Sequence, residues 1–232
     1  MEIYISLDGV LRNTIQKFDY HYKEYYLNSD EIKKDTPKLL PESQNKTVSD
    51  WEEETFDFKD EFEFDDEFKY KITNPIYNDN LLNYYSFHSK EEFNNFLYIE
   101  FPVEVFGQAG LSYGNVFTEL NKLIYDNPNI NFTIIGLNEL AKAKPSSLFF
   151  LSKNGFLGNH IKFVKSKDIE LEWNICDMWI TDNKEILDMC PENKKCIKFE
   201  TPYNQNFNSE LKINKLNEIQ DLWLESLENN TI

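Results

Sequence analysis

The chain has 232 residues, of which 41% are hydrophobic, and it carries a formal net charge of -17. A chain of this length forms one large domain, or one domain with a sizeable insertion. The charge disfavours direct binding to nucleic-acid phosphates or to an anionic membrane surface. The sequence has no run of about 18 apolar residues and no secretory signal pattern, so no transmembrane helix and no export are predicted.

The rarer residue types indicate the cellular setting. Three cysteines, an odd number, argue against a disulfide framework and indicate a reducing compartment. Three scattered histidines form no zinc-type cluster. Arg12 is the single arginine beside many lysines, and Asn, Ile, Phe and Tyr are abundant, as in AT-rich genomes. We therefore expect a bacterial or phage source, with the protein in the cytoplasm or in a virion.

The chain begins with a β-rich run, residues 2–7, which ends at Asp8 and Gly9. This pattern predicts a buried strand that delivers a carboxylate at its C-terminal end. Residues 13–97 are polar, rich in tyrosine and acidic, and we interpret them as an insertion. Within it, residues 50–68 hold eleven acids and one lysine. Aromatic residues alternate with these acids: Trp51, Phe56, Phe58, Phe62, Phe64 and Phe68. The segment is a surface hairpin, a disordered loop, or a contact segment for a basic partner.

From residue 98 onward, strands and helices alternate. Strands are predicted at 98–106, 130–135, 161–164, 177–181 and 196–199, and helices at 115–126, 138–156 and 183–190. Ser209 is expected to cap a last amphipathic helix that carries Leu211, Leu216, Ile219, Trp223 and Leu227. This alternation predicts an α/β fold with a three-layer core and a mostly parallel sheet, formed by residues 1–12 and 98–232.

Ligands of parallel sheets bind outside the carboxyl ends of the strands. The candidate site residues are therefore those that follow the strands: 6–9, 136–138 and 181–182. Lys144, on the helix after the second core strand, is expected to point into the same crevice, with Lys142 as the alternative.

Four stretches resemble the haloacid dehalogenase-like (HAD) phosphotransferase superfamily, nearest to its 5'(3')-deoxyribonucleotidase type. They are residues 3–10 (IYISLDGV), 132–136 (FTIIG), 144–151 (KPSSLFFL) and 177–182 (DMWITD), and residues 199–204 (FETPYN) resemble the stretch that follows. The resemblance implies a HAD-like core whose cap position is occupied by the insertion. It also implies the family's chemistry, in which a first Asp attacks phosphorus and a second acts as acid and base. A Thr or Ser and a Lys hold the phosphate, and a final Asp pair helps to hold Mg²⁺.

The sequence departs from this pattern at three of the positions. Ser6 stands in place of the nucleophilic Asp, Gly136 in place of the phosphate-binding hydroxyl, and Thr181 in place of one Asp of the pair. Asp8, Lys144 and Asp182 are retained. Each of these three residues also has a simpler interpretation: Asp8 as a turn cap, Asp182 as a helix cap and Lys144 as a solvated residue. Ser6 is interpreted as a small pocket residue. We expect a vestigial pocket that holds no metal, or Mg²⁺ on Asp8 and Asp182 if it holds one.

Three functional hypotheses follow. The first is a catalytically inactive HAD-like protein that contacts other protein subunits in an oligomeric assembly, in a setting such as a phage neck, tail or ring. The second is a Mg²⁺-dependent nucleotidase-like phosphatase whose nucleophile comes from the insertion, for example Glu24. The third is a module that binds a nucleotide without cleaving it, or a basic partner.

Overall fold

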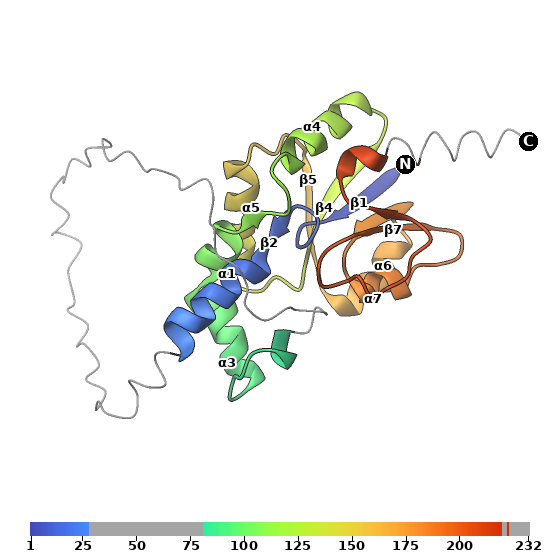
Figure 1. The fold of residues 1–232 in the computed structure, drawn as a ribbon. Helices are drawn as coiled ribbons and strands as arrows, with labels where there is room; N and C mark the ends of the chain where they lie inside the picture. The colour runs from blue at the N-terminus through green and yellow to red at the C-terminus, as the bar shows by residue number, and fades with distance from the viewer. Residues whose placement is uncertain (28–80, 220–221, 223–232) are drawn as a thin grey trace, which may run out of the picture.

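The computed structural model describes residues 1–27, 81–219 and 222, and its centre is a parallel six-stranded sheet (Figure 1). Its strands are β1 (Glu2–Ser6), β4 (Asn131–Leu137), β5 (His160–Val164), β6 (Met178–Thr181), β7 (Lys195–Phe199) and β8 (Lys212–Ile213), in spatial order β5-β4-β1-β6-β7-β8. All pairings in this sheet are parallel. The predicted α/β fold with a mostly parallel sheet is confirmed.

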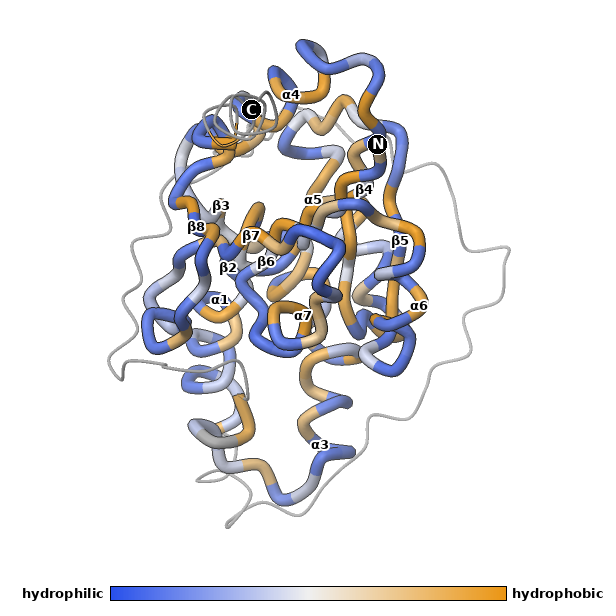
Figure 2. Tube along the Cα trace, turned by 90° about the vertical axis from the view of Figure 1, so that its right-hand side faces the viewer, coloured by the Kyte–Doolittle hydropathy of each residue, from blue (hydrophilic) through white to orange (hydrophobic). Residues whose placement is uncertain are grey.

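Helices cover both faces of the sheet (Figure 1). They are α4 (Val116–Asp126) and α5 (Ala143–Lys153) on one face, and α6 (Ile169–Trp173) and α7 (Lys184–Asp188) on the other. The alternation along β1 divides the core accordingly: Ile3 and Ile5 pack in the cluster with Leu120 and Phe150, whereas Tyr4 packs with Trp179. The central strands are hydrophobic along most of their length (Figure 2), as expected where both faces are buried.

A helical unit with its own aromatic core adjoins the carboxyl ends of the strands. It comprises α1 (Thr14–His21), η1 (Tyr22–Leu27), η3 (Leu81–Asn83), α3 (Lys90–Asn95), η4 (Phe96–Glu100) and η5 (Val103–Gly107). Phe18, Tyr22, Phe96 and Phe106 lie in its buried cluster. Side-chain caps begin two of the helices: Asn13 accepts from the Gln16 N–H in α1, and Ser89 accepts from the Glu92 N–H in α3.

A short antiparallel pair connects the unit to the core. In it, β2 (Arg12–Asn13) pairs with β3 (Gly110–Leu111). The proposed domain boundaries at 12/13 and 97/98 stay a prediction, and the acidic segment 50–68 lies outside the described residues. No helix within the described ranges is long and apolar enough to cross a membrane.

One predicted element is wrong, and two others begin later than predicted. Residues 98–106 form helical turns rather than a strand, with backbone bonds from Phe101 N–H to Phe96 O and from Gln108 N–H to Val103 O. These turns bury Leu97, Val105 and Phe106 in the helical unit. Packing of these residues overrides the β propensity of the local sequence.

The predicted helix 138–156 begins later, at Ala143. Before it the chain makes a turn in which Asn138 (φ 55°) and Ala141 (φ 44°) adopt left-handed backbone conformations. The predicted helix after Ser209 also begins later, because Lys212 and Ile213 pair with β7, and a 3-10 turn at Leu216–Glu218 leads into the α-helical residue Ile219. Ser209 donates its hydroxyl to the Leu211 carbonyl instead of capping a helix, and Trp223 and Leu227 lie outside the described residues.

Candidate functional site

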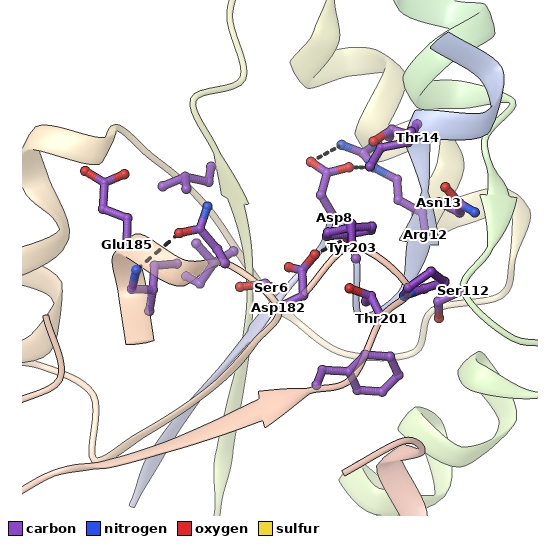
Figure 3. A pocket seen from close by; sticks show the side chains of 18 of the residues that line it. Ser6, Asp8, Arg12, Asn13, Thr14, Ser112, Asp182, Glu185, Thr201 and Tyr203 are labelled. Carbon is purple, nitrogen blue, oxygen red and sulfur yellow. Dashed lines mark hydrogen bonds and ion pairs between the residues drawn. The ribbon is translucent and has the colours of Figure 1, made fainter. Parts of the chain in front are cut away.

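A cavity of about 580 Å³ opens beside the carboxyl ends of β1, β6 and β7 (Figure 3). The strand order changes direction at β1, with β4 on one side and β6 on the other. This is the topological switch point at which open parallel sheets bind ligands. Ser6, Asp8 and Asp182 line the cavity, as does Tyr203 from the loop after β7. Three of the six predicted pocket residues therefore line the cavity, and a fourth, Thr181, is hydrogen-bonded to Ser6.

Ser6, at the end of β1, is part of a buried hydrogen-bond chain. Its hydroxyl donates to Thr181 Oγ1 at 2.8 Å and accepts from the Trp179 indole N–H at 3.2 Å. Thr181 Oγ1 also accepts the backbone N–H of Asn183 at 3.1 Å. The two groups bonded to the Ser6 hydroxyl are another hydroxyl and an indole, and neither is a base. Nothing in this arrangement activates Ser6 as a nucleophile.

Asp8 forms a bidentate ion pair with Arg12. The distances are 2.7 Å from Nε to Oδ1 and 3.1 Å from Nη2 to Oδ2. Nη2 also donates to Glu139 Oε1 at 2.7 Å, and Nη1 donates to Ser147 Oγ at 2.5 Å. The Arg12 side chain is fully buried, and its guanidinium lies 5.0 Å from the centre of the Phe106 ring. The Asp8 carboxylate thus bonds an arginine side chain, and the interpretation of Asp8 as a turn cap is wrong.

Burial and charge act in opposite directions on the two inner partners of this cluster. Burial disfavours the charged form of Arg12, but the carboxylates of Asp8 and Glu139 outweigh it and raise the Arg12 pKa. Burial raises the pKa of Glu139 to about 7, and the negative charge of Asp8 adds to this although Arg12 opposes it. One cation is therefore shared between two carboxylates, and Glu139 binds a proton more readily than an ordinary glutamate does.

Asp182 accepts hydrogen bonds through both its side chain and its backbone. The Tyr203 hydroxyl donates to its carboxylate, and the Asn204 amide donates to its backbone carbonyl at 3.2 Å. Burial and the negative charge of Asp182 together raise the Tyr203 pKa. The helix cap is Asn183, whose side chain accepts from the Ile186 N–H at 3.2 Å, so the interpretation of Asp182 as the cap is wrong.

Gly9 allows the loop after β1 to approach Asp182. Its φ is 76°, and a Cβ built at this position would lie 2.0 Å from the Asp182 carboxyl carbon. The glycine that follows Asp8 in the sequence is therefore explained by close packing against the second candidate carboxylate.

Gly136 and Lys144 are not among the residues that line the cavity, although Ile135 and Leu137, on either side of Gly136, are. A Cβ at Gly136 would come within 2.7 Å of both Glu139 Oε1 and the Phe163 ring, so Glu139 occupies the space where a larger residue would stand. Lys144 Nζ lies 5.4 Å from the centre of the Phe163 ring and lines a smaller cavity of about 190 Å³. The alternative, Lys142, donates to the Ile99 carbonyl at 3.5 Å. Neither lysine is among the described residues that line the large cavity.

The residues present do not fit a Mg²⁺ ion. Magnesium requires several free oxygen ligands in near-octahedral geometry. Both oxygens of Asp8 bond to Arg12, the Asp182 carboxylate accepts from Tyr203, and Ser6 offers a neutral hydroxyl. Across the described part of the chain, no three His, Cys, Asp or Glu side chains are grouped so that they could hold a metal.

Sequence reasoning missed Arg12, Glu139 and Tyr203. Arg12 had one signal, since it is the only arginine and lies four residues after the candidate Asp8. Glu139 had none, because it lies in the first turn of the helix predicted at 138–156. The candidate interaction residues Trp51, Phe56, Phe58, Phe62, Phe64 and Phe68 lie outside the described residues, and Glu24 is not among the residues that line the large cavity.

No protein-family model and no curated protein matches the chain. Among solved structures, a protein of Burkholderia xenovorans LB400 described as a haloacid dehalogenase-like hydrolase superposes with a TM-score of 0.51. The match covers 97% of this chain and 97% of that protein at 9% sequence identity. The fold is HAD-like. At this identity the likeness is one of fold alone, and the nucleotidase type stays a prediction.

Proposed function

We propose that this HAD-like protein performs no phosphoryl transfer and acts as an interaction subunit in an oligomeric assembly. The observation that carries the first half is the bidentate pair between Asp8 and Arg12. In the family, the corresponding acid gives and takes a proton at the reacting phosphate. Here both of its oxygens accept hydrogen bonds from a buried, permanently charged guanidinium, so the carboxylate is already bonded within the protein.

Two further observations support the absence of phosphoryl transfer. Ser6 supplies a neutral hydroxyl, already hydrogen-bonded to Thr181, where the family has its nucleophilic carboxylate. The large cavity is also lined by the acids Asp182, Glu185 and Glu200, which repel a phosphate or a nucleotide. The nucleotidase alternative and the nucleotide-binding alternative are therefore disfavoured.

The second half of the proposal rests on exposed apolar side chains. Ile99, Val103, Leu148 and Phe149 are 43–49% exposed, and they lie on η4, η5 and α5. These segments are adjacent, since Phe149 lies against Gly107 of η5 and Lys142 bonds the Ile99 carbonyl of η4. Exposed apolar groups that gather in this way are typical of protein contact surfaces. No observation bears on a phage virion, which stays a prediction.

We expect no Mg²⁺-dependent hydrolysis of deoxynucleoside monophosphates or an aryl phosphate above the rate of an Asp8→Asn variant. The physical reason is that neither Ser6 nor the bonded Asp8 is available for the chemistry. The measurement is release of inorganic phosphate by both proteins, purified side by side, with far-ultraviolet circular dichroism to check folding. Equal residual rates indicate a contaminating phosphatase. Activity that disappears in Asp8→Asn would overturn the proposal.

We expect a molar mass above that of the 27.7 kDa monomer in solution, lowered toward the monomer by Val103→Asp combined with Phe149→Asp. The introduced charges cannot be desolvated at an apolar contact. Light scattering coupled to gel filtration measures the mass. Tyr125→Asp is the matched control, because Tyr125 is 85% exposed on α4 and lies outside these segments. A wild-type monomer across the concentration range would contradict this half.

A further inference from the structure

The large cavity is lined by more acidic than basic side chains. Its charged lining residues are one arginine and four acids: Arg12, Asp8, Asp182, Glu185 and Glu200. The guanidinium of Arg12 is already bonded to the carboxylates of Asp8 and Glu139. Glu200 lies 3.4 Å from Lys212 Nζ, which is not among the lining residues. Asp182 and Glu185 add two further negative charges to the lining, so the cavity attracts a cation.

One buried hydroxyl group of the cavity has no hydrogen-bond partner among the described residues. It belongs to Thr201, which follows β7, lines the cavity and is 8% exposed. Figure 3 shows this hydroxyl directed toward Asp182. A buried hydroxyl that lacks a partner is energetically costly in a folded protein. We therefore expect a hydrogen-bond donor of a ligand to bond to it beside the Asp182 carboxylate.

The rest of the lining suits a short aliphatic chain. The cavity volume of about 580 Å³ lies within the range of small-molecule sites. Apolar side chains contribute to its walls: Ile15, Leu81, Ile135, Leu137, Ile186 and Phe199. In the view of Figure 3, Glu185 and Asp8 lie toward opposite sides, with Asp182 between them. A ligand with a positive charge at each end of a methylene chain matches this arrangement of acids and apolar groups.

We propose that the large cavity binds a small organic dication, an aliphatic diamine such as 1,4-diaminobutane. One ammonium group donates to the Asp182 carboxylate and to the Thr201 hydroxyl, and the other donates to Glu185. An ammonium group has three donors and no acceptor, so a carboxylate and an unpartnered hydroxyl suit it. It does not need the octahedral set of oxygens that Mg²⁺ requires, so the arrangement that excludes this metal ion still accepts an amine.

Equilibrium dialysis of the full-length protein against isotope-labelled 1,4-diaminobutane at neutral pH tests the proposal. We expect saturable binding of one diamine per chain. Unlabelled 1-aminobutane is expected to compete up to about fivefold more weakly, because it loses the exposed ion pair with Glu185. The uncharged 1,4-butanediol is expected not to compete. The proposal is overturned if no saturable binding is found at millimolar diamine, or if 1,4-butanediol competes as well as the unlabelled diamine does.

Three variants separate this site from general attraction of a cation to an acidic chain. Glu185→Gln and Asp188→Asn each remove one charge from α7, but Asp188 does not line the cavity. Glu185→Gln is expected to weaken binding up to about fivefold, and Asp188→Asn to leave it unchanged. Thr201→Val is expected to weaken binding about tenfold or more, because a hydrogen bond to a charged group is lost.

The free Thr201→Val protein is expected to be at least as stable as the wild type, because the replaced hydroxyl has no partner among the described residues. Urea denaturation without diamine measures this and checks that each variant is folded. The proposal is overturned if Asp188→Asn weakens binding as much as Glu185→Gln does, which would indicate attraction to the surface charge alone. It is also overturned if folded Thr201→Val binds the diamine as tightly as the wild type.

Discussion

Replacing Arg12 by Met is expected to lower the free energy of unfolding by about 3–5 kcal/mol, the usual cost of removing one partner from a buried ion pair. Methionine fills much of the space of the arginine stem but leaves Glu139 buried without its cation. The Glu139 side chain is 1% exposed, and Asp8 loses both of its hydrogen bonds from the guanidinium. Urea denaturation of wild type and variant at neutral pH, followed by intrinsic tryptophan fluorescence, measures the difference.

Two comparisons show whether burial causes the loss. Lys184→Met removes the cation of an exposed ion pair with Asp188, also four residues apart, and is expected to cost less than about 1 kcal/mol. The double variant Arg12→Met with Glu139→Gln removes both inner charges and is expected to regain part of the loss. If Arg12→Met lowers the free energy of unfolding no more than Lys184→Met does, the buried ion pairs of Arg12 with Asp8 and Glu139 do not hold the loop after β1 in place.

The sheet was predictable because local and tertiary preferences agree there. In residues 2–7 and 177–181 the β-rich apolar run, the burial on both faces and the acid at the end favour the same structure. Prediction failed where contacts with distant residues decide the backbone. Residues 98–106 have strand-like composition but become helical because they pack against α1 and α5. Lys212 and Ile213 form a strand because they pair in parallel with β7 at the edge of the sheet.

In the candidate site, too, the positions of the residues were predictable but their contacts with distant residues were not. The positions of Ser6, Asp8 and Asp182 follow from the rule that parallel strands end at a common edge. What these residues do depends on partners that the rule does not name. Arg12, Glu139 and Tyr203 come from a short strand and two loops. Arg12 and Tyr203 donate to the carboxylate oxygens of Asp8 and Asp182 that a metal would need, and Glu139 accepts a hydrogen bond from the guanidinium that could otherwise bind a phosphate. Motif order identifies the pocket, but only the distances show that its polar groups are bonded to one another.

The second large effect concerns pH and Glu139. Its pKa in the folded protein is raised to about 7 from an ordinary value of 4.5, chiefly by burial. Between these two pH values the folded protein binds a proton that the unfolded chain has released, so stability falls as pH rises. The contribution of Glu139 is fully present below about pH 4.5 and is lost as the pH rises through 7. A shift of this size corresponds to roughly 3 kcal/mol.

Glu139→Gln isolates this contribution, because glutamine keeps an oxygen to accept the Arg12 Nη2 hydrogen bond but does not titrate. Unfolding free energies of wild type and variant are measured from pH 5 to pH 8, and their difference cancels the other titrating groups. We expect the wild type to lose stability relative to Glu139→Gln across this range, with most of the change completed by pH 8. A difference that stays constant with pH would mean that Arg12 keeps Glu139 ionised throughout. In that case the single guanidinium neutralises both carboxylates, and protonation of Glu139 plays no part in the stability of the pocket.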